Sequence, residues 1–282
     1  MSLRLGILGY PLGHTISPAI QQAALDRLGI DARYEPWEVS PGKLAEEVER
    51  LRSPDVLGAN VTVPHKEAII PLLDSLDGWA ETVGAVNTIV NQDGKLCGYN
   101  TDSYGFTQGL EEASFDASRA RVLIIGAGGA ARGVALALAG MHVSSIAIAN
   151  RTVERAEKLT RELQSKVPDA KAVPLESGIL CPVALRSDLI VNCTSLGMRY
   201  SVEEGATPLY ADCITEAALA YDLVYNPLDT PFLREARRAG ARTMGGLHML
   251  VHQGAASLKL WTGQEAPLGV MMEAALAALG ER

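Results

Sequence analysis

The sequence predicts a two-domain α/β protein in which helices alternate with the strands of mostly parallel sheets. Its 282 residues suit two domains, since single domains commonly contain about 100–200 residues. Short apolar runs alternate with amphipathic stretches along the chain, a pattern typical of βα units. This rhythm restarts at Arg121, where the β-rich run Val122–Ile125 is followed by glycines. A second sheet is therefore expected in the latter half of the chain.

The first half is expected to contain three strands and a hairpin. Apolar runs predict the strands at residues 3–8, 33–39 and 57–63. The dipeptides Ser17-Pro18 and Ser40-Pro41 are typical helix starts, and a third helix is expected after Pro64. Asp93-Gly94 joins two β-rich runs over residues 86–99, which indicates a hairpin. We expect this hairpin at an edge of the first sheet.

The second half is expected to form a parallel sheet. Its strands are predicted at residues 122–125, 146–149, 188–193 and 220–225, with a weaker candidate at 242–244. A helix around residues 105–112 is expected to join the two domains, and the chain from Leu247 onward is expected to be helical.

The charge and hydropathy of the chain exclude two classes of partner. It carries 25 Lys and Arg against 33 Asp and Glu, a formal charge of −8. An acidic chain lacks the basic face that non-specific nucleic-acid binding requires, so no nucleic-acid partner is expected. No segment reaches the ~18 apolar residues of a membrane span, so no membrane partner is expected. A cytoplasmic protein that binds small molecules fits these properties.

Neither cysteines nor histidines form a recognisable metal motif. The four cysteines stand apart, at Cys97, Cys181, Cys193 and Cys213. Because no Cys-x-x-Cys spacing occurs, we expect reduced thiols, as in a cytoplasmic protein. His248 and His252 are four residues apart but lack the Glu of a His-Glu-x-x-His motif. No metal site is therefore expected.

The strongest local signal is a glycine-rich turn between a predicted strand and a predicted helix. The pattern Gly126-x-Gly128-x-x-Ala131 fits the dinucleotide-binding fingerprint of Rossmann-type, doubly wound domains. Gly126 permits the tight turn, Gly128 lets the backbone approach a pyrophosphate, and Ala131 lets the helix pack closely on the strand. The alternative is a plain glycine-rich turn, which the surrounding strand and helix disfavour.

The end of the next strand indicates which dinucleotide binds. NAD enzymes usually place an acidic residue there, to hold the ribose 2′-hydroxyl. This chain has the segment Asn150–Arg155, which contains Arg151 and Arg155 instead. Guanidinium groups suit a phosphate dianion, so the 2′-phosphate of NADP is the better ligand. The alternative is that Thr152 caps a helix and Arg155 is merely solvated.

Polar residues also follow the predicted strands of the first half, where an anionic substrate could bind. The notable ones have ordinary alternatives. Ser17 and Asp102 could be helix N-caps, Lys66 could be a surface lysine, and Asn87 could be a polar residue at the end of a strand. In the second half, the polar segment 192–198 could contact nicotinamide or be a simple turn. Several polar clusters at strand ends, beside a dinucleotide domain, favour a substrate site. The candidates in the first half are Thr15, Ser17, Thr62, Lys66, Asn87 and Asp102.

Motifs along nearly the whole chain resemble the shikimate dehydrogenase family. They occur in the family's order and spacing, which makes a chance match implausible. The matching segments are Gly9–Pro18, Asn60–Lys66, Gly84–Thr88, Gly98–Asp102, Gly126–Ala131, Asn150–Thr152, Tyr225–Pro227 with Thr230-Pro231, and Gly245–Gln253.

The resemblance implies a role for each matching residue. Lys66 and Asp102 match the catalytic pair. The positions that match substrate-binding residues are Thr15, Ser17, Thr62, Asn87, Tyr225 and Gln253. The positions that match the pyrophosphate loop and the adenosine-phosphate clamp are Gly126, Ala127, Gly128, Gly129, Ala130, Asn150, Arg151, Thr152 and Arg155. Leu223 and Gly246 match positions on the nicotinamide side of the cofactor.

The resemblance also implies an architecture and an activity. Residues 1–104 with the helices of 245–282 would form a discontinuous substrate-binding domain, and residues 105–244 the NADP-binding domain, with the active site in the groove between them. The implied reaction is the reversible NADPH-dependent reduction of 3-dehydroshikimate to shikimate, in chorismate and aromatic amino acid biosynthesis. The protein is expected to be a monomer or a homodimer.

One residue departs from the family pattern. The family usually has serine where this chain has Thr15. Threonine keeps the hydroxyl but adds a methyl group, which leaves open a quinate or dual quinate/shikimate dehydrogenase. A non-catalytic NADP-binding sensor is a further alternative, and the presence of both Lys66 and Asp102 argues against it.

Overall fold

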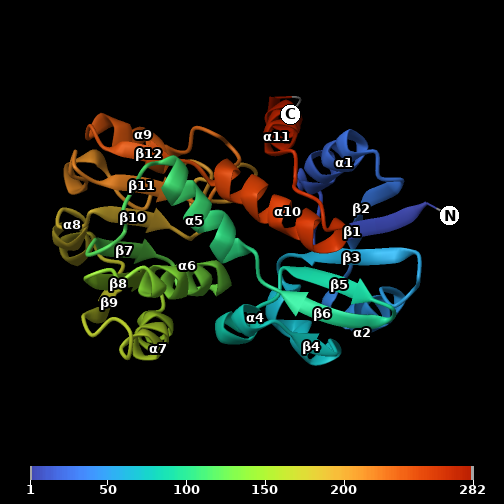
Figure 1. Ribbon diagram of the computed structural model, residues 1–282. Helices are drawn as coiled ribbons and strands as arrows, with labels where there is room; N and C mark the ends of the chain where they lie inside the picture. The colour runs from blue at the N-terminus through green and yellow to red at the C-terminus, as the bar shows by residue number, and fades with distance from the viewer. Residues whose placement is uncertain (1, 281–282) are drawn as a thin grey trace. The chain divides into compact units, whose positions relative to one another are not determined.

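The computed structural model describes residues 2–280 and divides into two compact units (Figure 1). The first unit runs to Gly105 and resumes at Val251, and the second is Phe106–Leu250. The predicted class, a Rossmann-type domain plus a discontinuous α/β domain, is confirmed. The assignment of substrate to one domain and cofactor to the other stays a prediction.

The first unit is built on a mixed six-stranded sheet with the order β2-β1-β3-β5-β6-β4. Its strands are β1 (Leu3–Gly9), β2 (Ala32–Glu38), β3 (Val56–Val61), β4 (Ser75–Leu76), β5 (Thr88–Gln92) and β6 (Lys95–Tyr99). β1 pairs in parallel with β2 and β3, whereas β5 runs antiparallel to β3 and β6. The predicted hairpin is therefore present as β5–β6. It is not at the edge of the sheet, because the two-residue strand β4 pairs outside β6.

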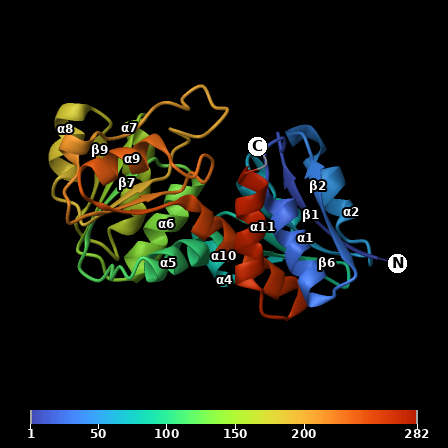
Figure 2. The same cartoon turned by 90° about the horizontal axis from the view of Figure 1, so that it is seen from above.

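Helices of the first unit cover the sheet and place polar residues at strand ends. They are α1 (Ser17–Leu28), η1 (Pro41–Lys43), α2 (Leu44–Arg50), α3 (His65–Ala68), η2 (Ile70–Leu72), α4 (Gly78–Val83) and α11 (Leu268–Gly280). α1 packs against α11, as Figure 2 shows. Two longer helices, α5 (Asp102–Glu112) and α10 (Gly246–Thr262), each begin in one unit and end in the other. The C-terminal segment thus belongs to the core of the first unit, where Leu258 is fully buried.

The second unit is a parallel six-stranded sheet with the order β12-β11-β10-β7-β8-β9, the doubly wound order of a Rossmann domain. Its strands are β7 (Arg121–Ile125), β8 (Ser145–Asn150), β9 (Ala170–Pro174), β10 (Leu189–Asn192), β11 (Leu219–Asp222) and β12 (Arg242–Met244). Its helices are α6 (Gly129–Gly140), α7 (Val153–Leu163), α8 (Ser177–Ala184), η3 (Ala211–Cys213) and α9 (Pro231–Arg238). The strand order reverses between β7 and β10, the usual ligand position in such sheets.

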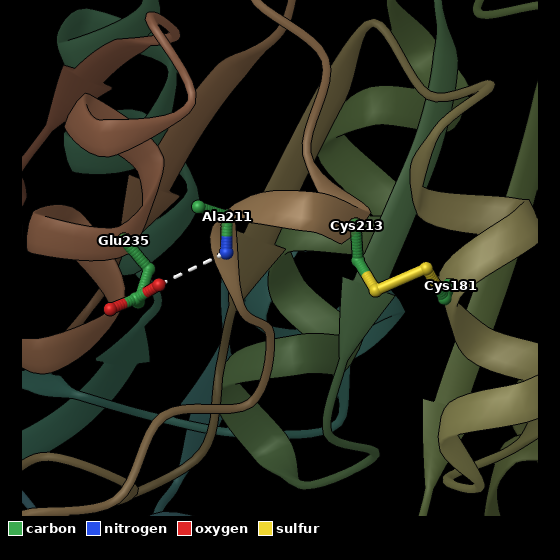
Figure 3. The surroundings of a disulfide bond; sticks show 4 residues. All are labelled: Cys181, Ala211, Cys213 and Glu235. Carbon is green, nitrogen blue, oxygen red and sulfur yellow. Dashed lines mark hydrogen bonds between the residues drawn. A yellow bond between two sulfur atoms is a disulfide. The ribbon is translucent and has the colours of Figure 1, made fainter.

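The expectation of four reduced cysteines is wrong for two of them. The structure joins Cys181 of α8 to Cys213 of η3 by a disulfide bond, with 4.8 Å between the Cα atoms (Figure 3). Beside it, the backbone N–H of Ala211 donates to the carboxylate of Glu235 on α9. Cys97 and Cys193 are free. Because 32 positions separate the bonded pair, sequence spacing gave no indication of the bond.

Candidate active site

Candidate substrate residues of the first unit gather at one edge of its sheet. Thr15 and Ser17 follow β1, and Thr62 follows β3. The pairing of these two strands extends to Leu8 opposite Val61, near the carboxyl end of each strand. β5 runs antiparallel to β3, so its first residues lie at the same edge. The segments that carry the polar clusters therefore begin at the same end of the sheet, as expected for the carboxyl ends of parallel strands.

Lys66 and Asp102 form an ion pair at this edge. Lys66 lies in the short helix α3, and Asp102 is the first residue of α5. Lys66 Nζ donates a hydrogen bond to Asp102 Oδ2 at 2.5 Å. The two side chains retain 26% and 15% of their exposure, so the pair is partly shielded but open to a small molecule. The structure therefore places Asp102 inside α5 as its first residue, with its carboxylate paired to Lys66.

Asn87 fixes the second oxygen of the same carboxylate. Its Nδ2 lies 2.9 Å from Asp102 Oδ1, 2.8 Å from Thr101 Oγ1 and 3.1 Å from Gln253 Oε1. Its Oδ1 accepts a hydrogen bond from the backbone N–H of Thr101. Because both ends of this buried amide are bonded, its orientation is fixed. Of the predicted site residues, the structure therefore brings Lys66, Asn87, Asp102 and Gln253 together.

Beneath these residues lies a buried network that the sequence interpretation missed. Ser257 Oγ lies 2.7 Å from Thr88 Oγ1 and 3.3 Å from Thr101 Oγ1, and it accepts from Asn60 Nδ2 at 3.0 Å. Tyr34 donates to Asn60 Oδ1 at 2.7 Å, and burial raises the pKa of Tyr34, so this donor stays neutral. The i, i+4 spacing of Gln253 and Ser257 on one helix was the available signal.

The helix-cap alternative for Ser17 is not what the structure contains. Ile16 occupies the N-cap position of α1, and no side chain caps this helix. The hydroxyl of Thr15 instead accepts a hydrogen bond from the backbone N–H of Ser17 at 3.3 Å. Both hydroxyl-bearing residues are half-buried at a helix N-terminus, where the aligned peptide dipoles favour an anionic group.

The glycine-rich turn of the second unit fits a pyrophosphate. Gly126 has φ = +111°, and a Cβ there would lie 3.1 Å from the carbonyl oxygen of Cys193, so glycine is needed. Gly128 is the N-cap of α6, and a Cβ built on it meets nothing within 4 Å. Gly128, Gly129 and Ala130 are exposed, while Ala131 is fully buried against the sheet. The helix N-terminus is thus open to a phosphate group.

The segment after β8 offers cations and no carboxylate at the strand end. Asn150 Nδ2 donates to the carbonyl oxygen of Thr152 at 2.8 Å, which folds the segment into a turn. Thr152 is the N-cap of α7 but makes no side-chain cap bond. Arg151 and Arg155 are exposed. These groups suit a phosphate dianion.

The remaining predicted residues lie in the second unit, around the end of β11. Leu223 and Tyr225 follow this strand, and Gly246 begins α10. A Cβ on Gly246 would lie 2.2 Å from the carbonyl oxygen of Leu223, so only glycine permits this approach. The roles assigned to these residues, as to the others of the site, stay predictions.

Two negative findings concern the described residues 2–280. No helix among them is long and apolar enough to span a membrane. They also contain no group of three or more His, Cys, Asp or Glu side chains placed to hold a metal ion.

A Rossmann unit with an open glycine turn and a second α/β unit with a Lys–Asp pair define the class of dinucleotide-dependent oxidoreductases. Comparison with known families narrows this class. The model of the shikimate dehydrogenase substrate binding domain matches residues 7–89. The model of shikimate / quinate 5-dehydrogenase matches residues 109–199. The model of the shikimate 5′-dehydrogenase C-terminal domain matches residues 246–276. The chain belongs to the shikimate dehydrogenase family, as the sequence motifs predict.

Individual relatives agree with the family models. A shikimate dehydrogenase (NADP(+)) of Moorella thermoacetica is 49% identical over 278 residues, which cover 98% of this chain and 93% of the relative. The crystal structure of shikimate 5-dehydrogenase from Thermus thermophilus, in complex with NADP(H) and shikimate, matches with a TM-score of 0.88 and 39% identity over 98% of this chain and 100% of that one.

Enzymes with other substrates share this fold. Quinate dehydrogenase from Corynebacterium glutamicum, in complex with NAD, matches with a TM-score of 0.89 and 30% identity over 98% of this chain and 99% of that one. Substrate choice within this fold therefore depends on individual side chains rather than on architecture.

Proposed function

We propose that this chain is an NADP-dependent oxidoreductase that reversibly reduces 3-dehydroshikimate to shikimate. The observation that carries the proposal is the Lys66–Asp102 pair, held by Asn87 at the same strand edge. Its relatives at 39–49% identity are named for this activity. A non-catalytic NADP-binding protein would have no need for the paired ammonium and carboxylate, so the pair also supports catalysis over a sensor function.

Bound NADPH supplies the hydride that reduces the C3 carbonyl group of the substrate. Lys66 donates a hydrogen bond to the carbonyl oxygen, stabilises the negative charge that develops on it and supplies the proton. Asp102 orients the Lys66 ammonium and accepts a hydrogen bond from a substrate hydroxyl. In the oxidation direction, the pair removes the proton of the hydroxyl group. Asn87 keeps the carboxylate of Asp102 in place throughout.

The remaining candidates bind substrate and cofactor. Thr15 and Ser17 hold the substrate carboxylate at the N-terminus of α1, and Thr62, Tyr225 and Gln253 contact its hydroxyl groups. The turn Gly126–Ala130 holds the pyrophosphate, and the segment Asn150–Arg155 holds the 2′-phosphate. These groups fit NADP better than NAD because the strand ends at Asn150 instead of the acid usual in NAD enzymes, and Arg151 and Arg155 follow it.

The biological setting follows from the activity. We place the enzyme in the cytoplasm, in the biosynthesis of chorismate and the aromatic amino acids, as a monomer or a homodimer. Quinate remains the competing substrate, because Thr15 adds a methyl group beside the position assigned to the substrate carboxylate.

Initial rates with two substrates and two cofactors test the proposal. The purified protein would oxidise shikimate or quinate with NADP⁺ or NAD⁺, followed by the absorbance of the reduced cofactor. We expect fast turnover with shikimate and NADP⁺ alone. Equal or faster turnover with quinate would make the protein a dual enzyme and place Thr15 at the centre of specificity. No turnover in any combination, with NADP⁺ binding intact, would overturn the proposal in favour of a sensor.

A further inference from the structure

Asp222 is a fully buried carboxylate that the proposed reaction does not use. It is the last residue of β11, with no exposed surface. Its Oδ1 accepts hydrogen bonds from Asn192 Nδ2 at 2.9 Å and from the backbone N–H of Val224 at 3.0 Å. Its Oδ2 accepts from Thr230 Oγ1 at 2.6 Å. Asn192 ends β10 and Thr230 caps α9, so one side chain holds three separate segments together.

Those segments carry the residues assigned to the nicotinamide side of the cofactor. The backbone N–H of Leu223 donates to the carbonyl oxygen of Asn192 at 3.0 Å, and that of Gly246 donates to the carbonyl oxygen of Val224 at 3.3 Å. Asn192 Oδ1 in turn accepts from both the backbone N–H and the hydroxyl of Thr194. The loops after β10 and β11 and the start of α10 are therefore one connected assembly centred on Asp222.

Among residues 2–280, the donors that hydrogen-bond to the Asp222 carboxylate are all neutral. Its donors are an amide, a hydroxyl and a peptide N–H, and the titratable group that interacts with it is the thiol of Cys193. Burial raises the pKa of Asp222 to about 6, with the three hydrogen bonds acting in the opposite direction. Burial likewise raises the pKa of Cys193, and Asp222 adds to that rise, so the thiol stays neutral. A buried charge without an ion-pair partner is unfavourable for folding alone.

A charged acceptor nevertheless gives stronger and more directional hydrogen bonds than a neutral one. We propose that Asp222 is a positioning residue that holds Leu223 and Gly246 in the arrangement that receives the nicotinamide end of the cofactor. It acts through these loops without touching the reacting atoms, since it is completely buried. This inference rests on the proposed function, and it adds a residue to which the sequence motifs assign no role.

Asp222→Asn tests the proposal, because the amide keeps the size of the side chain but replaces one acceptor oxygen with a donor. We expect kcat with shikimate and NADP⁺ to fall about 10- to 100-fold, as for a small misplacement of a reacting group. The dissociation constant for 2′,5′-ADP, which contains only the adenosine end of the cofactor, should stay unchanged. Amide hydrogen exchange of the ligand-free protein should become faster at Val224 and Gly246 and stay slow in β7.

Thr230 supplies a matched pair of variants should Asp222→Asn fail to fold. Thr230→Ser keeps the hydroxyl that donates to Asp222 and caps α9, and should retain wild-type kinetics. Thr230→Val removes it and should reproduce the loss of kcat with 2′,5′-ADP binding intact. Asp188→Asn is the control, because Asp188 precedes β10 at the opposite end of the strand and pairs with Arg121 at the surface. It should leave kcat unchanged.

The outcomes separate this inference from the proposed function. Turnover by the wild-type protein tests the function, and the comparison of variant with wild type tests the role of Asp222. Unchanged kcat in Asp222→Asn and Thr230→Val would overturn the positioning role. So would a parallel loss of 2′,5′-ADP binding, which would indicate general damage to the domain. If the wild type binds 2′,5′-ADP but turns over nothing, the proposed function fails. Amide exchange at Val224 and Gly246, compared between Asp222→Asn and the wild type, then still decides whether Asp222 holds these loops.

Discussion

The hydroxyl oxygens of Thr88 and Ser257 lie 2.7 Å apart, although 169 positions of sequence separate the two residues. Thr88 begins β5, and Ser257 lies in α10, one helical turn after Gln253. Their contact joins α10 to β5, the strand that follows Asn87. The geometry of the Lys66–Asp102 pair therefore depends on a helix from the far end of the chain.

Ser257→Ala tests this dependence. Removal of the hydroxyl leaves Thr88 and Asn60 each without one buried partner, so we expect the free energy of unfolding to fall by about 1–3 kcal/mol. The KM for shikimate should rise, because Asn87 and Gln253 lose support. Urea denaturation and steady-state kinetics measure the two effects. Ser118→Ala, at an exposed position, is the control, and equal behaviour of the two variants would show that the network does not support the site.

Lys66→Gln removes the proton donor of the proposed reaction. We expect kcat to fall about 10²- to 10⁴-fold, the usual contribution of general acid–base catalysis, with little change in the KM for shikimate. Lys95→Gln, on the exposed start of β6, should behave as wild type. A large rise in KM with kcat intact would make Lys66 a binding residue instead.

Arg151→Ala addresses cofactor choice. A charge-assisted hydrogen bond to the 2′-phosphate contributes about 1.5–3 kcal/mol, so kcat/KM for NADP⁺ should fall about 10- to 100-fold. The kcat/KM for NAD⁺, which lacks this phosphate, should change little. Arg161→Ala is a suitable control because Arg161 is exposed on the helix that follows, beyond its first turn. A parallel loss for both cofactors would place Arg151 outside phosphate recognition.

The sequence was sufficient to predict the parts of the fold that local patterns specify. The glycine-rich turn that begins at Gly126 joins β7 to α6, as predicted. The positive φ of Gly126 favours glycine whatever the surrounding tertiary contacts, so this local pattern is readable from sequence. The hairpin around Asp93-Gly94 formed for the same reason. By contrast, β9 and α8 were missed. β9 is short and contains Lys171 and Pro174, and α8 has Pro182 inside it, so neither shows a strong periodic pattern.

The sequence predicts those residues of the candidate site that belong to motifs with a known chemistry. Lys66, Asn87 and Asp102 were found, and they do lie together. Ser257 and Asp222 were not, because each depends on a partner far away in the sequence: Asn60 lies 197 positions from Ser257, and Asn192 lies 30 positions from Asp222. Such contacts arise only when the sheets and helices are packed. The bond between Cys181 and Cys213 was missed for the same reason.

The disulfide gives a prediction about stability. Cross-linking residues 32 positions apart restricts the unfolded chain, which corresponds to about 3–4 kcal/mol in the loop-entropy treatment. The variant with Cys181→Ser and Cys213→Ser should therefore unfold at lower urea concentration than oxidised wild type. Under denaturing conditions a thiol reagent should modify two cysteines before reduction and four after it. Four reactive thiols in the unreduced protein would contradict the bond, which is uncommon in the cytoplasm.

Asp222 gives a pH dependence of known sign. Its pKa is 3.8 in the unfolded reference and about 6 in the folded protein, where burial disfavours the charge. Between these values the folded protein holds a proton that the unfolded chain has released. The contribution of Asp222 to stability is therefore present in full below about pH 4 and is lost as the pH rises through about 6.

Asp222→Asn lacks this titration. From pH 4 to pH 7, the unfolding free energy of the wild type should therefore fall by about 2–3 kcal/mol relative to that of the variant. Ion-paired carboxylates with lowered pKa values, such as Asp74 and Asp188, contribute the opposite slope to both proteins and cancel in the difference. Urea denaturation of the two proteins across this range measures the effect. Parallel pH profiles would mean that Asp222 is already ionised at pH 4, held so by its three hydrogen bonds.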